Sequence, residues 1–424
     1  MPEVSAMLVR PPSRGTRTSR APQPPAGIQV VRLRSLPQVR ALAPEWARLA
    51  ETAGALNPFH HPDWLVPWAE RSLRPGEQIW LLTAHKRGRL VGVAPLYRRS
   101  WGLGLAHSMQ LWGTGRNSTL IELPQFLLDQ EQPRAVARAL VDRLCAESRG
   151  WDWAELLLGE SLWLEPDWLP RGGSVTLLTK GVRANVVLPV NGPEPPAMKR
   201  NLRESLRRAR NRLDRAYPGA WSIACASTGP DLPGALADLA RLHDERSRLA
   251  GKKRHPNALA READWAVLSG AAAALAGRGA VAVYRLLVDG LAIAGLLVLR
   301  TAECTYFLLS GMSESGWEFS PVTLLQQRAA EDAVKLGQRC VNFSTGADTP
   351  KLRWSEKLTA TPEFVLVPNR FGARVRFAAY WQASAAAAVA RERNRHQLAG
   401  ESGTLPCRPC YQDLAVAPPR PRRG

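Results

Sequence analysis

The residues that begin at Ser320 have the types and spacing of a site for a phosphorylated ligand. Ser320 suits the N-cap of a helix, and Pro321 suits the first helical position, where a backbone N–H is not needed. The start of such a helix presents free N–H groups and partial positive charge, which favour a bound anion. We therefore predict that Ser320, Val322, Thr323 and Leu324 bind a pyrophosphate. The same pattern also begins ordinary crossover helices, and that alternative stays open at this point.

A second candidate is His243, which lies in the segment ARLHDERSR and has a helical pattern around it. A histidine can exchange a proton near neutral pH. Its neighbours Asp244, Glu245 and Arg246 give it mixed electrostatic surroundings. We predict that His243 and Arg246 contact the substrate. A hydrogen-bonded role within the scaffold is the alternative for His243.

The most basic stretch, residues 199–215, has eight basic residues and two acidic ones, in a chain of formal net charge +20. Its apolar residues recur at helical spacing, so one stripe packs and the other faces present arginines. Such a helix could capture an anion, namely the phosphates of a cofactor, an acidic acceptor or RNA. A solvated helix face is the alternative, because no aromatic residues that could stack on bases are interleaved.

The elements around Ser320 follow a defined order. Asp289-Gly290 is a strong hairpin signal between two apolar, β-branched runs, and Gly337 ends the helix that begins after Ser320. The order is strand, tight turn, strand, strand, helix, strand, which predicts a mixed sheet with a crossover helix. The predicted strands are residues 281–288, 291–299, 304–310 and 340–344.

The same order occurs a second time, nearer the start of the chain. GRLVGVAPL begins at Gly88 and GLAIAGLLV begins at Gly290, an offset of 290 − 88 = 202 residues in a chain of 424. Because the flanking elements recur in the same order, we predict two copies of one domain. The first copy has predicted strands at 79–85, 90–97, 107–112 and 152–158 and a helix at 132–148.

These features together resemble the CelD-like, or BioF-like, acetyltransferases, a tandem GNAT family related to the Fem peptidyl transferases. The resemblance covers most of residues 28–370 and rests on residues 57–68, the basic segment from Met198, and Ser320 through Trp354. The chain departs from the family pattern in two places. It has Val322 where relatives often have glycine, and Asn342 where they often have an acidic residue.

The resemblance implies an α/β (α+β) fold with two tandem GNAT-like domains, each a mixed β-sheet flanked by helices. Pro- and Arg-rich residues at the start and the Pro-rich end have the composition of disordered segments. The expected divisions are a leader at 1–27, domains at 28–190 and 191–370, a helix at 371–398 and a tail at 399–424.

The activity that the resemblance implies is acyl transfer, with acetyl-CoA as donor and an amine or hydroxyl on a small molecule or glycan as acceptor. Polysaccharide or cell-envelope metabolism is the expected setting. A backbone N–H of the strand at 304–310 would polarise the thioester carbonyl. Tyr306 and Ser310 would donate a proton to the thiolate, and strand alternation predicts that both lie on one face.

The loop after the last core strand completes the expected site. The resemblance makes Lys351, with Trp354 three residues later, the best pair for substrate contact, and Asp348 precedes them. Lys351 could instead be an exposed cation, and Trp354 a core residue. Loops at strand ends are where a scaffold displays chemistry. We predict catalytic contact for Lys351 and substrate contact for Asp348 and Trp354.

Two other classes of function remain open. A Fem-like transferase would take its aminoacyl group from tRNA held by the basic helix, and a silent module would bind an anionic polysaccharide or a partner. Cys407 and Cys410 form the one close cysteine pair, without the four ligands of structural zinc, so no metal is expected. The six scattered cysteines suggest a reducing, cytoplasmic location. No apolar run reaches the roughly 18 residues of a membrane span.

Overall fold

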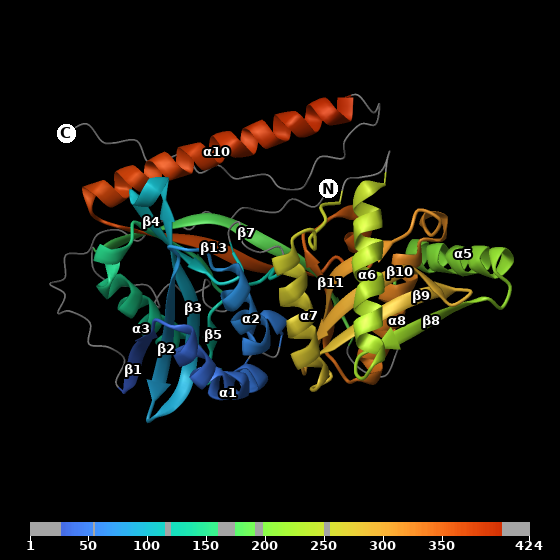
Figure 1. Cartoon of the computed structure of the whole chain (residues 1–424), viewed down its shortest axis with the longest axis horizontal. Helices are drawn as coiled ribbons and strands as arrows, with labels where there is room; N and C mark the ends of the chain where they lie inside the picture. Colours follow the sequence, from blue (N-terminus) through green and yellow to red (C-terminus); the bar gives the residue numbers. More distant parts are fainter. Residues whose placement is uncertain are drawn as a thin grey trace.

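The computed structural model describes residues 27–53, 56–114, 120–159, 174–190, 198–249 and 255–400. It contains two halves side by side, the first in blue and teal and the second in green to orange (Figure 1). The expected leader up to residue 26 and the tail from residue 401, with Cys407 and Cys410, lie outside the described residues. No helix in the described ranges is long and apolar enough to cross a membrane.

The two halves repeat one order of elements. The first half contains β1 (Ile28–Leu33), α1 (Leu36–Ala53), α2 (Pro62–Ser72), β2 (Gln78–Lys86), β3 (Arg89–Trp101), β4 (Ala106–Leu111), α3 (Pro133–Ala146), β6 (Trp153–Leu157) and β7 (Val175–Pro189). The second half contains β8 (Trp221–Ala226), α6 (Asp231–Arg248), α7 (Glu262–Ala276), β9 (Val281–Val288), β10 (Leu291–Arg300), β11 (Cys304–Met312), α8 (Pro321–Lys335), β12 (Cys340–Thr345) and β13 (Leu358–Pro368).

Apart from short 3₁₀ helices, four further elements complete the described chain. The short β5 (Leu127–Leu128) pairs with β3, and the basic helix α5 (Arg200–Ala216) lies between the halves in sequence and packs on the second half. The one-turn α9 (Thr349–Leu352) precedes β13, and α10 (Phe371–Gly400) follows it. The predicted repeat and the predicted strands are confirmed, with ends that differ by a few residues.

The predicted hairpin turn at Asp289-Gly290 and its counterpart at Arg87-Gly88 have the same backbone conformation. Asp289 and Gly290 have φ values of 49° and 78°, and Arg87 and Gly88 have 51° and 77°. Positive φ at both central residues matches the twist of the flanking strands. The two turns fix the registers of β2 with β3 and of β9 with β10, which are antiparallel in both halves.

The last strand of each half is exchanged with the other half. The sheet is continuous, in the order β1-β2-β3-β4-β6-β13-β7-β12-β11-β10-β9-β8. The second half supplies β13, which pairs with β6 of the first half, and the first half supplies β7, which pairs with β12 of the second. β7 and β13 pair antiparallel with each other over Leu358–Pro368. The two halves therefore share one mixed sheet.

Aromatic residues fill much of the core of the first half. Trp64 and Trp68, four residues apart on α2, are buried and in one cluster with Trp46 and Trp112. The same cluster continues into the second half, where it includes residues of α6 and α7. The other face of the second half has its own core with α5 and α8, to which Leu202, Leu206, Ala209 and Leu213 contribute as predicted.

Candidate functional site

The strands β11 and β12 separate soon after they begin to pair. Their parallel pairing covers Cys304 with Cys340, Thr305 with Val341, and Tyr306 with Asn342. Beyond Tyr306, the described strands leave β11 paired with β10 alone. The opening exposes one edge of the β11 backbone, whose N–H and C=O groups can bind a ligand.

A β-bulge reshapes β11 within this opening. Val298 of β10 pairs with Phe307, but the next residue back, Leu297, pairs with Leu309, so Leu308 is the extra residue. A bulge bends its strand and re-aims the residues beyond it. The prediction that Tyr306 and Ser310 lie on one face is therefore wrong. Tyr306 pairs with Leu299, whereas Ser310 pairs with Leu296, three residues away and hence on the other face.

The start of α8 lies after a 3₁₀ turn at Trp317–Phe319. Ser320 occupies the N-cap, but its backbone is left-handed, with φ 50° and ψ 46°, and its hydroxyl makes no capping hydrogen bond. The predicted side-chain cap is therefore wrong, because capping requires an extended backbone at this residue. Thr323 N–H donates to Ser320 O at 3.1 Å. Val322 and Thr323 are half-buried, whereas Leu324 is a core residue.

His243 and Arg246 of α6 both contact Ser310 at the far end of the opening. The Ala258 N–H donates to Nε2 of His243 at 3.1 Å, so Nδ1 carries the proton and donates to Ser310 O at 2.9 Å. Arg246 donates to Ser310 Oγ at 2.7 Å and lies 2.9 Å from His255 Nε2. Burial lowers the pKa of His243. This geometry agrees with the alternative in which His243 is a hydrogen-bonded residue of the scaffold.

The three predicted site residues in and around α9, which are Asp348, Lys351 and Trp354, all have partners nearby in the structure. Asp348 caps α9 by accepting from the Lys351 N–H at 3.2 Å, and Lys351 Nζ donates to Thr345 O. Trp354 is 3% exposed and packs on Phe343, with ring centroids 5.2 Å apart. Trp354 thus lies in the core, while Lys351 and Asp348 stay half-buried at the end of β12.

The sequence reasoning missed Glu122, which the first half inserts at the opening of the second. Its carboxylate accepts from the Tyr306 hydroxyl, from Ser344 Oγ at 2.8 Å and from the Thr345 N–H at 3.3 Å. These partners lie more than 180 residues away in sequence. The available signal was a single acidic residue within the apolar segment LIELPQF.

Tyr306 holds Glu122 from inside the core. Its side chain is fully buried, and its ring meets Phe59 of the first half edge-on at 5.1 Å. The Asn185 amide donates to the Tyr306 oxygen at 3.2 Å and to Asn342 Oδ1 at 3.0 Å. Burial, followed by the charge of Glu122, raises the pKa of Tyr306 well above its ordinary value. The hydroxyl therefore stays protonated and donates to Glu122.

Among the described residues, no group of three histidine, cysteine, aspartate or glutamate side chains is placed to hold a metal ion. The site thus brings together Tyr306, Asn342, Ser344 and Glu122, with Ser310 on the opposite side of the opening. It offers one carboxylate, a free strand edge and a helix start.

Comparison with known proteins defines the class of the second half. Residues 200–352 match the family model described as Acetyltransferase (GNAT) domain. The chain therefore contains a GNAT-type acetyltransferase domain, and the expected α/β fold with a mixed sheet flanked by helices is confirmed. No curated protein sequence matches the chain. The finer placement among CelD-like or BioF-like proteins stays a prediction.

Solved structures are similar over most of the chain at low sequence identity. The crystal structure of FemX is similar with a TM-score of 0.54 and 11% identity, over 76% of this chain and 95% of that one. A tandem GNAT protein from the clavulanic acid biosynthesis pathway has a TM-score of 0.39 and 14% identity, over 80% and 98%. L-PGS from Bacillus licheniformis has a TM-score of 0.41 and 11% identity, over 76% and 90%.

Proposed function

We propose that this protein transfers an acetyl group from acetyl-CoA to an amine or hydroxyl of a small-molecule or glycan acceptor. The observation that carries the proposal is the opening between β11 and β12, bulged at Leu308 and followed by the start of α8. A free strand edge can hydrogen-bond an extended pantetheine arm, and a backbone N–H near the bulge can polarise the thioester carbonyl. The pyrophosphate would lie at Val322 and Thr323.

The position of α5 supports an anionic donor at α8. Arg210 of α5 donates to Gln327 of α8 at 2.9 Å, and Tyr217, just after α5, packs on Phe319 with ring centroids 5.6 Å apart. The two helices are therefore antiparallel neighbours, and the end of α5 lies beside the start of α8. The exposed arginines of α5 raise the local positive potential, which attracts the phosphates of CoA.

Glu122 is the group that we assign to proton transfer. The acceptor nitrogen or oxygen attacks the thioester carbon, a new bond to that carbon forms, and the carbon–sulfur bond breaks. The proton of the acceptor passes to the Glu122 carboxylate and from there to the departing thiolate, so that CoA leaves as a thiol. Tyr306, which is fully buried, is a positioning residue that holds Glu122. Ser344 holds the other carboxylate oxygen.

Titration with acetyl-CoA tests the donor. A ligand that binds only the folded state stabilises it by mass action, by about 2.7 kcal/mol at a hundredfold over Kd. We expect acetyl-CoA and CoA to raise the melting temperature and acetyl-CoA to be consumed when an acceptor is present. No shift at millimolar acetyl-CoA would contradict the proposal. Binding of CoA without turnover across a panel of amines and alcohols would favour the silent module.

The exposed face of α5 favours one alternative, in which the acyl group comes from a charged tRNA. Arg203, Arg207 and Arg208 are among the exposed arginines of α5, and Arg210, also exposed, donates to Gln327. If the helix binds tRNA, affinity should fall steeply with salt and drop when Arg203, Arg207 and Arg208 become glutamine. If it only adds positive potential beside CoA, the triple variant weakens CoA binding at low salt and shows no effect of tRNA.

A further inference from the structure

The first half has its own strand opening, between β4 and β6. These parallel strands pair only at Ser108 with Trp153 and at Met109 with Ala154, and then separate. A cavity of about 260 Å³ occupies this opening, with walls from β3, β4, β6, β7, β13 and Tyr380 of α10. It corresponds by repeat to the opening of the second half, but it is lined by charged side chains.

The link from strand to helix differs between the two openings. In the second half, α8 begins 321 − 312 = 9 positions after β11 ends, whereas α3 begins 133 − 111 = 22 positions after β4 ends. The first half thus lacks the close strand-to-helix link that would present a helix start to a pyrophosphate. Its cavity suits a smaller molecule than CoA.

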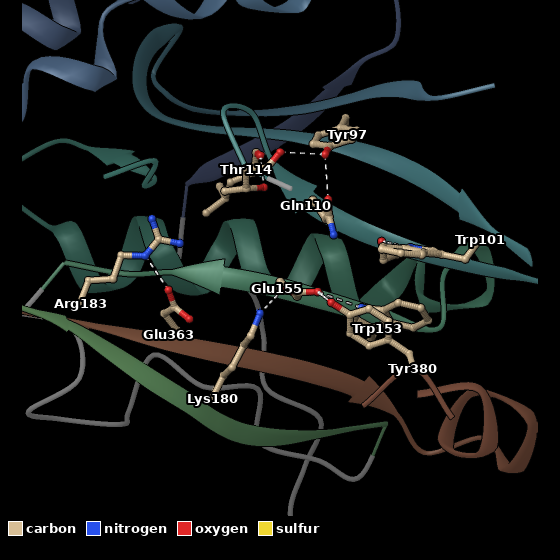
Figure 2. A network of polar contacts seen from close by, with 12 residues as sticks. Tyr97, Trp101, Gln110, Thr114, Trp153, Glu155, Lys180, Arg183, Glu363 and Tyr380 are labelled. Atoms are coloured by element: carbon tan, nitrogen blue, oxygen red, sulfur yellow. Dashed lines mark hydrogen bonds and ion pairs between the residues drawn. The ribbon is translucent and has the colours of Figure 1, made fainter. Parts of the chain in front are cut away.

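Two ion pairs define the floor of the cavity, and Figure 2 shows both. Lys180 of β7 reaches Glu155 of β6, and Arg183 reaches Glu363 of β13, each at 2.5 Å. Tyr380 donates to Glu155 at 2.8 Å. Burial alone would raise the pKa of Glu155, but Lys180 and these hydrogen bonds hold it below its ordinary value. Both members of the Lys180–Glu155 pair are therefore charged at neutral pH.

The opposite wall holds a buried guanidinium group with one unsatisfied N–H donor. Arg99 is 8% exposed and lies over the Trp101 ring at 4.1 Å, and its Nε is 3.7 Å from Glu77. Its NH1 is buried and has no hydrogen-bond partner among the described residues. Tyr97 donates to Gln110 Oε1 at 2.7 Å, which turns the Gln110 amide nitrogen toward the side of Glu155 (Figure 2).

The ion pairs of the lining leave one donor unsatisfied. Lys180 pairs with Glu155, Arg183 pairs with Glu363, and Arg99 has Glu77 at 3.7 Å, but NH1 of Arg99 has no hydrogen-bond partner among the described residues. A buried guanidinium N–H left unpaired is costly, and a bound carboxylate would satisfy it with a charge-assisted hydrogen bond. The aromatic rings of Trp101 and Tyr380 add an apolar wall beside it.

We propose that this cavity is a second ligand site, which binds a small organic carboxylate with its anionic group at Arg99 and Gln110 and its apolar part against Trp101 and Tyr380. The site lies outside the opening of the second half and does not depend on the proposed acetyl transfer. A carboxylate-bearing acceptor and a carboxylate effector share this chemistry. They differ in that only an acceptor would be consumed together with acetyl-CoA.

Calorimetric titration of the full chain with benzoate, pyruvate and acetate tests the site, with benzamide as the uncharged match for benzoate. We expect saturable binding of at least one carboxylate, no binding of benzamide, and a loss of about tenfold or more in Arg99→Gln. Arg98→Gln is the control, because Arg98 immediately precedes Arg99 on β3 but donates to Gln78 instead. Binding should be unchanged in that variant.

Two further variants keep the test decisive if Arg99→Gln does not fold. Arg99→Lys keeps the charge but loses the forked donor, and Gln110→Leu removes the amide. Each should weaken carboxylate binding while CoA still stabilises the protein, which separates this site from the donor site. Equal affinity in the parent and all folded variants would overturn the proposal. The proposal would also be overturned if none of the three carboxylates showed saturable binding at millimolar concentrations.

Discussion

Glu122 is the residue on which the proposed chemistry depends most directly. Its carboxylate accepts three hydrogen bonds at the opening, so glutamine can keep much of the shape but cannot take a proton. General acid–base groups contribute about 10²–10⁴-fold to rate. We expect Glu122→Gln to lower kcat for acetyl transfer within that range and to leave the Kd of CoA within about twofold. Steady-state kinetics with a CoA titration measures both quantities.

A pair of buried tyrosines provides the control for this assignment. Tyr306→Phe removes a donor to Glu122 and should lower kcat, whereas Tyr284→Phe removes a donor to Asp332 on the other face of the sheet. Both tyrosines are fully buried, so each substitution should lower the free energy of unfolding by about 1–3 kcal/mol. Only Tyr306→Phe should change kcat. Equal loss of kcat in both variants would contradict the role of Glu122.

At the level of elements, the sequence predicted what local patterns determine. The Asp289-Gly290 turn, the end of α8 near Gly337 and the burial of the α5 stripe depend on neighbouring residues, and the structure confirms them. The bulge at Leu308 depends on how β11 meets two different strands. The contacts of Glu122 depend on residues far away in sequence, so periodicity could not predict them, and it does not specify the left-handed backbone of Ser320.

The start of α8 can be tested by adding a charge. Thr323→Asp places a carboxylate in the first turn, where it complements the helix dipole by roughly 0.3–1 kcal/mol but repels a bound phosphate. We expect the melting temperature to hold or rise while CoA affinity falls by about tenfold, or 1.4 kcal/mol. Ala135→Asp is the matched control, because Ala135 is the third residue of α3, as Thr323 is of α8. An unchanged CoA Kd in Thr323→Asp would remove the pyrophosphate from this helix.

The contact between α6 and β11 is close enough to be tested by one methyl group. A Cβ on Gly311 would lie 2.4 Å from the backbone nitrogen of His243, and helix backbone cannot move aside cheaply. Overpacking of this kind costs about 1–3 kcal/mol, sometimes more. We expect Gly311→Ala to lower the free energy of unfolding by at least that amount in urea titrations. Gly234→Ala on the same helix meets nothing within 4 Å and should be neutral or stabilising.

Over the whole molecule, exchange of β7 and β13 makes the two halves interdependent. β6 of the first half would lose its neighbour without β13, and β12 of the second would lose its neighbour without β7. The continuous core and the pair of helices α2 and α7 add to this interface. The two halves repeat one order of elements, but they are not independent folding units.

The interface between the halves should also respond to acid. His60 and His61 of the first half are buried there, and Arg278 of the second half lies 2.5 Å from Nε2 of His61. Burial lowers the pKa of His60 to about 4, and burial with the charge of Arg278 lowers that of His61 to about 3. Both histidines are thus neutral in the folded state, and Arg278 is also paired with Glu51 and Asp63.

The sign of the pH dependence follows from these shifts. The unfolded chain binds protons near the ordinary histidine value of 6.5, whereas the folded chain resists them, so stability is full above pH 6.5 and falls as pH drops toward 4. The slope should approach about 1.4 kcal/mol per pH unit for each histidine. Asp63 has the opposite effect. Burial is the main cause of its raised pKa, so the folded chain gains stability from this group as the pH falls, but only at the acid end of this range. Urea titrations across the range should show the loss, and replacing both histidines with glutamine should reduce the slope by two protons. A double variant with the slope of the parent would show that other groups destabilise the interface.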